Sequence, residues 1–126
     1  MYILCNPHNP VGKIYTKEEI EAIVRLCNKY DVFLVSDEIH SDLIIYGHEF
    51  TSVGKFFHLH DKIAVCISPS KTFNIAGLRI ANLVLKNEEI KAKVRKHLDR
   101  YKIGGASLLS LLACETAYNK CEYWVI

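Results

Sequence analysis

The sequence lacks the features of a disulfide-rich, repetitive or membrane-spanning protein. Its 126 residues contain no CxxC pair, no internal repeat and no low-complexity segment. The five cysteines are odd in number and three lie inside apolar runs, which favours buried, reduced thiols and a cytoplasmic location. The charge-free run 103–114 is shorter than the roughly 18 residues that a membrane span needs. Only four apolar residues follow Met1, so we expect no secretory signal and no membrane partner.

The chain also lacks a strong excess of charge of one sign. Its formal net charge is +2, and its 50% hydrophobic and 24% charged residues are typical of one soluble globular domain. A basic cluster alternates with Ile90, Val94 and Leu98 at helical spacing. This spacing predicts a solvated helix face and no nucleic-acid partner. The cluster consists of Lys91, Lys93, Arg95, Lys96, Arg100 and Lys102.

Apolar runs between polar segments predict the secondary structure. Four such runs are expected to be strands, at residues 2–5, 32–36, 63–67 and 79–85. The run at 32–36 is continuous rather than alternating, which is typical of a strand covered on both faces. Helical spacing and capping residues predict helices at residues 17–30, 88–99 and 107–120.

Two of the predicted helices carry more detailed expectations. Thr16 and Glu19 form a capping box at the start of the first helix. The last helix is expected to turn four side chains inward: Leu108, Leu111, Leu112 and Cys114. Because strands alternate with helices, we predict an α/β fold with three layers, α/β/α, and a mostly parallel sheet.

Polar clusters follow the first three predicted strands. They occupy the loop 6–12, the acidic segment 37–40 and the segment 68–71, which begins a predicted loop 68–77. Ligands bind beyond the carboxyl ends of the strands in sheets of this kind. Each cluster alone is consistent with an ordinary loop, but their equivalent positions lead us to treat them as one predicted site.

The stretch 32–40, VFLVSDEIH, is compatible with several chemistries. As the magnesium-holding strand of a helicase-type nucleotidase it would need a GxxxxGK[ST] loop, and the absence of that loop from these residues counts against this interpretation. A metal site would draw on Asp37, His40 and Asp42, with His8 or His48 as candidates for a further ligand. Neither HExxH nor HxH spacing occurs, so the metal signal is weak.

The segment Ser68-Pro-Ser-Lys71 matches the S-x-x-K motif of penicillin-binding proteins and β-lactamases. That motif opens a helix and is accompanied by SDN and KTG tripeptides. Neither tripeptide occurs in the chain, and Pro69 lies within the motif. The match is therefore a weak indication of that chemistry.

A site for pyridoxal 5'-phosphate accounts for more of these residues. This cofactor uses a lysine for its Schiff base, an acid at its pyridine nitrogen, and hydroxyl and guanidinium groups for its phosphate. The relevant segments are NPHNPVG at 6–12, SDEIHSDL at 36–43 and SPSKTFNIAGLR at 68–79. With these segments the chain resembles a fold type I pyridoxal-phosphate enzyme of the aminotransferase class I/II superfamily. It is most similar to the MalY/PatB-type cystathionine β-lyase (carbon–sulfur lyase) branch.

The resemblance implies a role for each of seven residues. Lys71 would form the Schiff base and remove the Cα proton of the substrate, and Asp37 would pair with the pyridinium nitrogen. Asn9 would hydrogen-bond the phenolic oxygen, and His40 stands where many aminotransferases carry a tyrosine that also touches this oxygen. The phosphate would be held by Ser68, Ser70 and Arg79.

The resemblance also implies an activity. The enzyme would act on a small-molecule amino acid with a thiolate on Cβ and release the thiol, pyruvate and ammonia. The same residues would serve an aminotransferase, so the preference for a lyase rests on the resemblance alone. Glu38 has no assigned chemistry and is expected to be a structural acid.

Enzymes of this family are much longer than the chain and form homodimers. Residues 1–126 are therefore expected to be an incomplete, central part of the cofactor-binding large domain, without the residue that binds the substrate carboxylate. A second alternative to the lyase is a truncated, catalytically inactive fragment.

Overall fold

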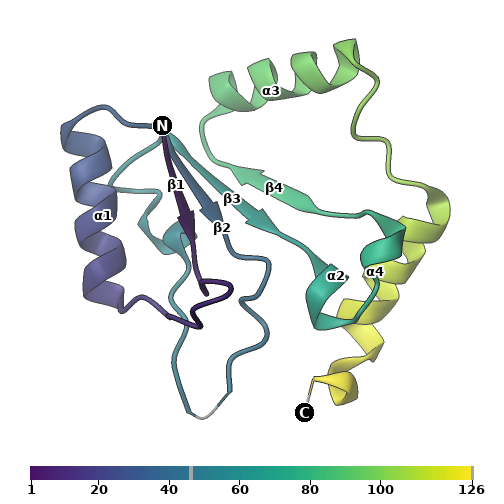
Figure 1. Ribbon diagram of the computed structural model, residues 1–126. Coiled ribbons are helices and arrows are strands. Elements are labelled where there is room, and N and C mark those ends of the chain that lie inside the picture. The colour runs from purple at the N-terminus through teal and green to yellow at the C-terminus, as the bar shows by residue number, and fades with distance from the viewer. Residues whose placement is uncertain (46, 126) are drawn as a thin grey trace.

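A four-stranded sheet forms the centre of the computed structural model, which describes residues 1–45 and 47–125 (Figure 1). The strands lie in the order β1-β2-β3-β4. Their bounds are β1 Tyr2–Cys5, β2 Leu34–Asp37, β3 Ile63–Ile67 and β4 Asn82–Leu85. The first three run parallel, and β4 runs antiparallel to β3. The predicted α/β class with a mostly parallel sheet is confirmed.

Helices connect the strands. The α-helices are α1 Lys17–Lys29, α2 Pro69–Thr72, α3 Glu88–Arg100 and α4 Leu108–Lys120. Short 3-10 helices are η1 Val53–Phe56, η2 Ala76–Leu78 and η3 Glu122–Trp124. Thr16, Asn87 and Ser107 cap α1, α3 and α4 with their side chains. The predicted capping box of Thr16 and Glu19 is confirmed. Within residues 1–45 and 47–125, no helix has both the length and the apolar character that crossing a membrane would require.

The hydrophobic core lies between one face of the sheet and α1 with η1. The strands contribute the side chains that point to this face, and α1 contributes residues at helical spacing. The buried members are Leu4, Ile20, Val24, Cys27, Leu34, Val53, Phe56, Ile63 and Val65. In Figure 1, α1 runs along one side of the sheet, and α3 lies beyond β4.

The opposite face of the sheet is less well covered. Leu83 and Leu85 of β4 line a cavity of about 720 Å³ together with Val94 and Leu98 of α3. Ile3, on the same face of β1, is 62% exposed. On this face Val35 of β2 is only partly buried, whereas Ala64 of β3 is 4% exposed. The prediction that residues 32–36 are buried on both faces is therefore met only in part. The basic residues of α3 are exposed, as predicted.

The inward face predicted for the last helix is wrong. Leu108, Leu111 and Leu112 are each more than half exposed, and Cys114 is only partly buried. The buried residues of α4 are Ser110 and Ala117. The Ser110 hydroxyl donates to the carbonyl oxygen of Leu78 at 2.7 Å, and the ring of Tyr118 packs edge-to-face against Phe73. These contacts, made by residues that the prediction did not include, attach this helix to the rest of the molecule.

Two predicted strand boundaries and one predicted loop are also wrong. The fourth strand begins at Asn82 and not at Arg79, because Arg79 has a left-handed backbone (φ 49°) that does not continue a strand. The segment 68–77 is not an irregular loop but contains α2 and the start of η2. The second strand begins at Leu34, because the N–H of Val32 still bonds to Cys27 of α1.

Candidate functional site

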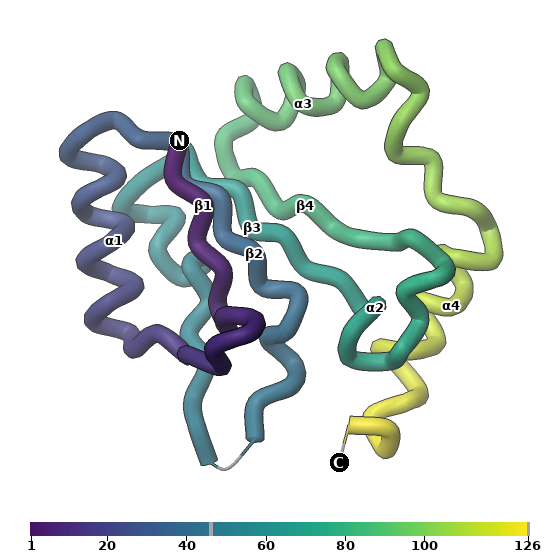
Figure 2. The backbone as a smooth tube through the Cα atoms, viewed as in Figure 1, coloured from purple at the N-terminus to yellow at the C-terminus, as the bar shows by residue number. Residues whose placement is uncertain are grey.

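The ends of the parallel strands bring the three polar clusters to one edge of the sheet. Cys5, Asp37 and Cys66 are paired across β1, β2 and β3 at the same level. Figure 2 shows the chain leaving these strands toward the same end of the sheet. Because β4 is antiparallel, it begins at this end, and Arg79 just before it lies on the same side. The predicted convergence of the clusters is confirmed.

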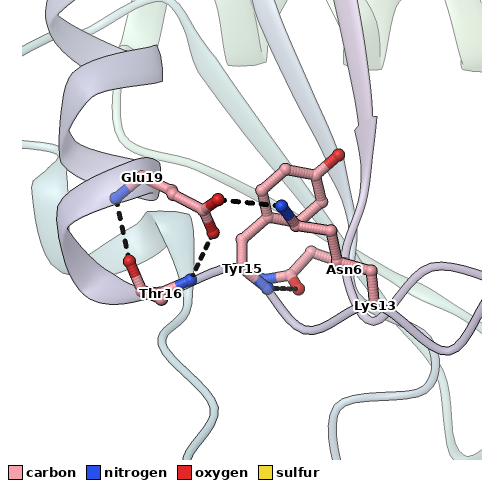
Figure 3. A network of polar contacts seen from close by, with 5 residues as sticks. All are labelled: Asn6, Lys13, Tyr15, Thr16 and Glu19. Atoms are coloured by element: carbon pink, nitrogen blue, oxygen red, sulfur yellow. Dashed lines mark hydrogen bonds and ion pairs between the residues drawn. The ribbon is translucent and has the colours of Figure 1, made fainter.

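The loop after β1 is held in place by Asn6. This buried residue donates its N–H to the carbonyl oxygen of Asp37 at 3.0 Å, and its side-chain oxygen accepts from the N–H of Tyr15 at 3.1 Å. Figure 3 shows how the loop is also tied to α1, through the 2.8 Å ion pair between Lys13 and Glu19. These contacts fix both ends of the segment that carries Asn9.

Asn9 and His40 line one hollow of about 350 Å³. His8 and Leu43 are part of the same lining. The Nδ1 atom of His40 is buried and has no hydrogen-bond partner among the described residues. The structure thus brings together two of the predicted site residues, from loops that follow different strands.

Asp37 is the last residue of β2 and is half-buried. Its Oδ1 atom accepts a hydrogen bond from the N–H of Ile39 at 3.3 Å. In the described parts of the chain, Asp37 takes part in no ion pair. A carboxylate in this setting is available for a cationic partner from outside the chain.

Glu38 points the other way and is a structural acid, as expected. Its side chain is only 2% exposed, and its Oε1 atom accepts from the Ser36 hydroxyl at 2.8 Å and from the N–H of Val53 at 2.9 Å. Burial raises the pKa of the Glu38 carboxyl, against the opposing effect of hydrogen bonds from Ser52, Val53 and Ser36. This acid joins β2 to η1 and is enclosed in protein.

The raised pKa of Glu38 predicts a pH dependence of stability. Between the ordinary value of 4.5 and the higher folded value, the native chain holds a proton that the unfolded chain releases. The contribution of Glu38 to stability is therefore fully present below pH 4.5 and is lost as the pH rises through the folded pKa. Glutamine can accept the same two hydrogen bonds without becoming charged. We expect Glu38→Gln to remain more stable than the wild type as the pH rises.

Urea unfolding of both proteins between pH 4 and pH 8 measures this difference. Glu115→Gln, at an exposed position in the middle of α4, is the matched control and should follow the wild-type curve. If the free energies of unfolding of the wild type and Glu38→Gln stay parallel over the whole range, the explanation is incorrect.

Ser70 and Lys71 lie on the short helix α2, and Ser68 is its N-cap. The Ser68 hydroxyl caps this helix, accepting from the N–H of Ser70 at 3.1 Å, and lies 2.7 Å from the carbonyl oxygen of Ile80. The Oγ atoms of Ser68 and Ser70 are 2.8 Å apart. The S-x-x-K segment does open a helix, but Ser68 is buried and its hydroxyl is engaged by backbone groups. It is poorly placed to act as a nucleophile.

Lys71 and Arg79 are positioned through contacts made by their neighbours in the chain, Thr72 and Ile80. The Thr72 hydroxyl donates to the Asp42 carboxylate at 2.9 Å, which ties α2 to the loop that carries His40. Arg79 follows η2 and precedes Ile80, whose carbonyl is bonded to Ser68. Both cationic side chains are exposed, and neither makes a hydrogen bond or ion pair with another described residue.

The residues considered for a metal site do not gather around one point. Across residues 1–45 and 47–125, no three His, Cys, Asp or Glu side chains lie close enough together to hold an ion. Asp42 is engaged by Thr72. The observed arrangement is one carboxylate, one amine, one guanidinium, two imidazoles and an amide along the same edge.

The sequence did not point to two residues of this edge, Cys5 and Cys66, which flank Asp37 on the neighbouring strands. Their positions depend on the strand register, which the sequence does not reveal. His8, which the sequence offered only as a candidate metal ligand, lines the hollow next to Asn9.

Comparisons with known proteins give consistent results. The sequence model of the family Aminotransferase class I and II matches residues 1–120. Cystathionine beta-lyase PatB from Bacillus subtilis (strain 168) is 41% identical over 129 residues, covering 99% of this chain and 33% of that protein. Cystalysin from Treponema denticola, which contains a pyridoxal 5'-phosphate cofactor, superposes with a TM-score of 0.92 at 40% identity, covering 98% of this chain and 32% of cystalysin.

A second solved structure gives the same result. The PLP-bound C-S lyase from Staphylococcus hominis has a TM-score of 0.89 and 36% identity, covering 98% of this chain and 30% of that lyase. The chain spans about a third of the length of the curated relatives it matches.

Proposed function

The chain belongs to the aminotransferase class I and II family, and from this we propose that it carries the cofactor site of a pyridoxal-phosphate-dependent carbon–sulfur β-lyase. Residues 1–126 would be the central part of the cofactor-binding large domain. The whole protein would work as a homodimer in the cytoplasm, a location supported by its five free cysteines. Its substrate would be an amino acid that carries a sulfur leaving group on Cβ.

The observation that best supports this proposal is the setting of the Asp37 carboxylate. A half-buried carboxylate that has one backbone donor and no ion pair among the described residues stands at the carboxyl end of a parallel strand. The nearby amine of Lys71 is exposed, and its helix is tied to the loop that follows Asp37. An acid for a ring nitrogen and an amine for covalent attachment are the two groups that this cofactor requires.

The other residues at this edge fit the rest of the cofactor. The amide of Asn9 and the imidazole of His40, whose Nδ1 atom lacks a partner among the described residues, suit a phenolic oxygen. Arg79 offers a planar pair of donors for a phosphate, and Ser70 offers a hydroxyl. Ser68 would act on the phosphate chiefly through Ser70, because its own hydroxyl lies against Ile80 and Ser70.

Each residue then has a definite task. The bound cofactor supplies an electron sink for the electron pair that is left on the substrate Cα. Lys71 Nζ would remove the Cα proton, and Asp37 would hold a proton on the ring nitrogen. Arg79 and Ser70 would hold the phosphate, and Asn9 would orient the ring. The overall lyase reaction would consume one water and yield the thiol, pyruvate and ammonia.

Product analysis with an S-substituted cysteine tests the proposal. A lyase is expected to release thiol, pyruvate and ammonia in equal amounts without any added 2-oxo acid. An aminotransferase would instead require a 2-oxo acid acceptor and would form a product that retains the sulfur substituent. The second result, or no turnover by the full-length protein loaded with pyridoxal phosphate, would contradict the proposed activity.

Arg79 provides a prediction about cofactor binding. A left-handed backbone costs a non-glycine residue about 1–2 kcal/mol, whereas glycine adds about 0.5–1 kcal/mol of chain entropy to the unfolded state. We therefore expect Arg79→Gly to change the free energy of unfolding by less than about 1 kcal/mol. The loss of a charge-assisted phosphate contact should raise the cofactor dissociation constant by about tenfold or more.

Lys102→Gly is the matched control, because Lys102 also has a left-handed backbone (φ 53°) but lies after α3. It should show the same small change in stability and no change in cofactor affinity. Equal affinities of the wild type and Arg79→Gly, measured by titration with pyridoxal phosphate, would remove Arg79 from the phosphate site.

A further inference from the structure

Two cysteines stand on either side of Asp37. Cys5 of β1 pairs in register with Asp37 of β2, and Asp37 pairs with Cys66 of β3. Residues paired across neighbouring strands point to the same face of a sheet and are separated by about 4.8 Å. Both thiols therefore share the face and the level of the carboxylate, at the end of the sheet where the site lies.

Neither thiol is paired with the carboxylate by a hydrogen bond. Cys5 Sγ donates to the carbonyl oxygen of Pro7 at 3.5 Å, and Cys66 Sγ makes no hydrogen bond among the described residues. Burial raises the pKa of the Cys66 thiol, and the charges of Asp37 and Glu38 raise it further. At neutral pH this thiol is uncharged, and a thiol is a weak donor in comparison with a hydroxyl.

The two thiols cannot join each other. Two strand spacings separate Cys5 from Cys66 by about 9.6 Å between Cα atoms, which is beyond the roughly 7 Å limit of a disulfide. They remain two separate groups with Asp37 between them. The carboxylate is thus flanked on both neighbouring strands by small, weakly polar side chains.

We propose that Cys5 and Cys66 are positioning residues. Their side chains flank the place where a cationic group binds the Asp37 carboxylate. They exclude competing charges and strong hydrogen-bond donors, so that the carboxylate is left to a flat cationic ring that enters between them. This inference rests on the proposed function, in which that ring is the pyridinium of the cofactor. The Ile39 N–H is then the one donor from the described residues that Asp37 retains.

Substitution of Cys66 tests whether Asp37 needs a weak hydrogen-bond donor beside it. Serine has nearly the same shape but is a stronger donor that would bond to Asp37, whereas alanine leaves the carboxylate free. We expect Cys66→Ser to raise the dissociation constant of pyridoxal phosphate by about three- to tenfold and to raise it more than Cys66→Ala does. A side chain needed only for packing would give the opposite order, because serine fills the space better.

Coupling to Asp37 separates the proposed role from a general loss of structure. In an Asp37→Asn background, the difference between serine and alanine at position 66 should shrink to less than about twofold, because the charged acceptor is gone. Serine and alanine at Cys114, a partly buried cysteine of α4, serve as the matched pair and should have equal affinities in both backgrounds. A difference between serine and alanine at position 66 that persists unchanged in the Asp37→Asn background would overturn the inference.

Thiol labelling gives a second readout that does not depend on activity. The full-length protein is treated with N-ethylmaleimide with and without pyridoxal phosphate, and each cysteine is followed by mass spectrometry. The cofactor is expected to protect Cys5 and Cys66 but not Cys114 or Cys121, which are also partly buried. Lys71-dependent cofactor absorbance without this protection would overturn the inference and leave the proposed function intact. Absence of Lys71-dependent absorbance would overturn both.

Discussion

Replacing Lys71 with alanine is expected to abolish covalent cofactor binding and to lower turnover by about 10³-fold or more. Lys71 is exposed on α2, and no described residue engages its amine. The same amine would attach the cofactor and remove the substrate proton, so one substitution eliminates two functions. Borohydride reduction of the wild type followed by mass spectrometry should place the cofactor on the peptide that contains Lys71, and the variant should carry none.

Two variants control for charge and for surface lysines. Lys71→Arg keeps the positive charge but forms no stable link with an aldehyde, so it should be as inactive as Lys71→Ala. Lys96→Ala removes an exposed lysine from α3 and should behave as the wild type. Reduction that attaches the cofactor to another lysine, with turnover intact in Lys71→Ala, would refute the assignment of Lys71.

The end of the sheet at which the site lies could be predicted from the sequence. Parallel strands deliver their carboxyl ends to one edge, so polar clusters that follow successive buried strands meet there whatever the details of packing. The strand Ile63–Ile67 and the capping box of Thr16 and Glu19 were predicted correctly for similar local reasons. These features depend on short segments whose apolar runs and capping residues are visible in the sequence.

Features that depend on contacts between distant segments could not be predicted. The spacing of leucines in α4 suggests a buried face, but Ser110 faces the protein because it bonds to the carbonyl of Leu78, a contact across 32 residues. The positions of Cys5 and Cys66 beside Asp37 depend on strand register, and a slip of one residue would move either thiol to the other face. Arg79 has a left-handed backbone that the sequence does not signal, and this conformation shortens β4.

Asp37→Asn is expected to retain the cofactor on Lys71 but to lower turnover by about 10²–10³-fold. The asparagine oxygen can still accept from the N–H of Ile39, so the end of β2 should keep its conformation. The amide has no negative charge to hold a proton on the ring nitrogen, so the ring loses most of its capacity to accept the Cα electron pair. Steady-state turnover, measured alongside the borohydride-reduced adduct, separates loss of chemistry from loss of cofactor.

Two further variants test whether the loss of turnover in Asp37→Asn comes from this particular carboxylate or from the removal of any acid. Asp99→Asn removes an exposed carboxylate from α3, and it should leave both turnover and adduct at wild-type levels. Asp37→Glu restores the charge but moves it by one methylene between Cys5 and Cys66, so we expect activity between those of the wild type and Asp37→Asn. A wild-type turnover rate in Asp37→Asn would contradict the assignment, because the proton on the ring nitrogen would then have to be held by another group. None of the other carboxylates in the described residues occupies that place between the two thiols, because Glu38 points into the core and Asp42 is bonded to Thr72.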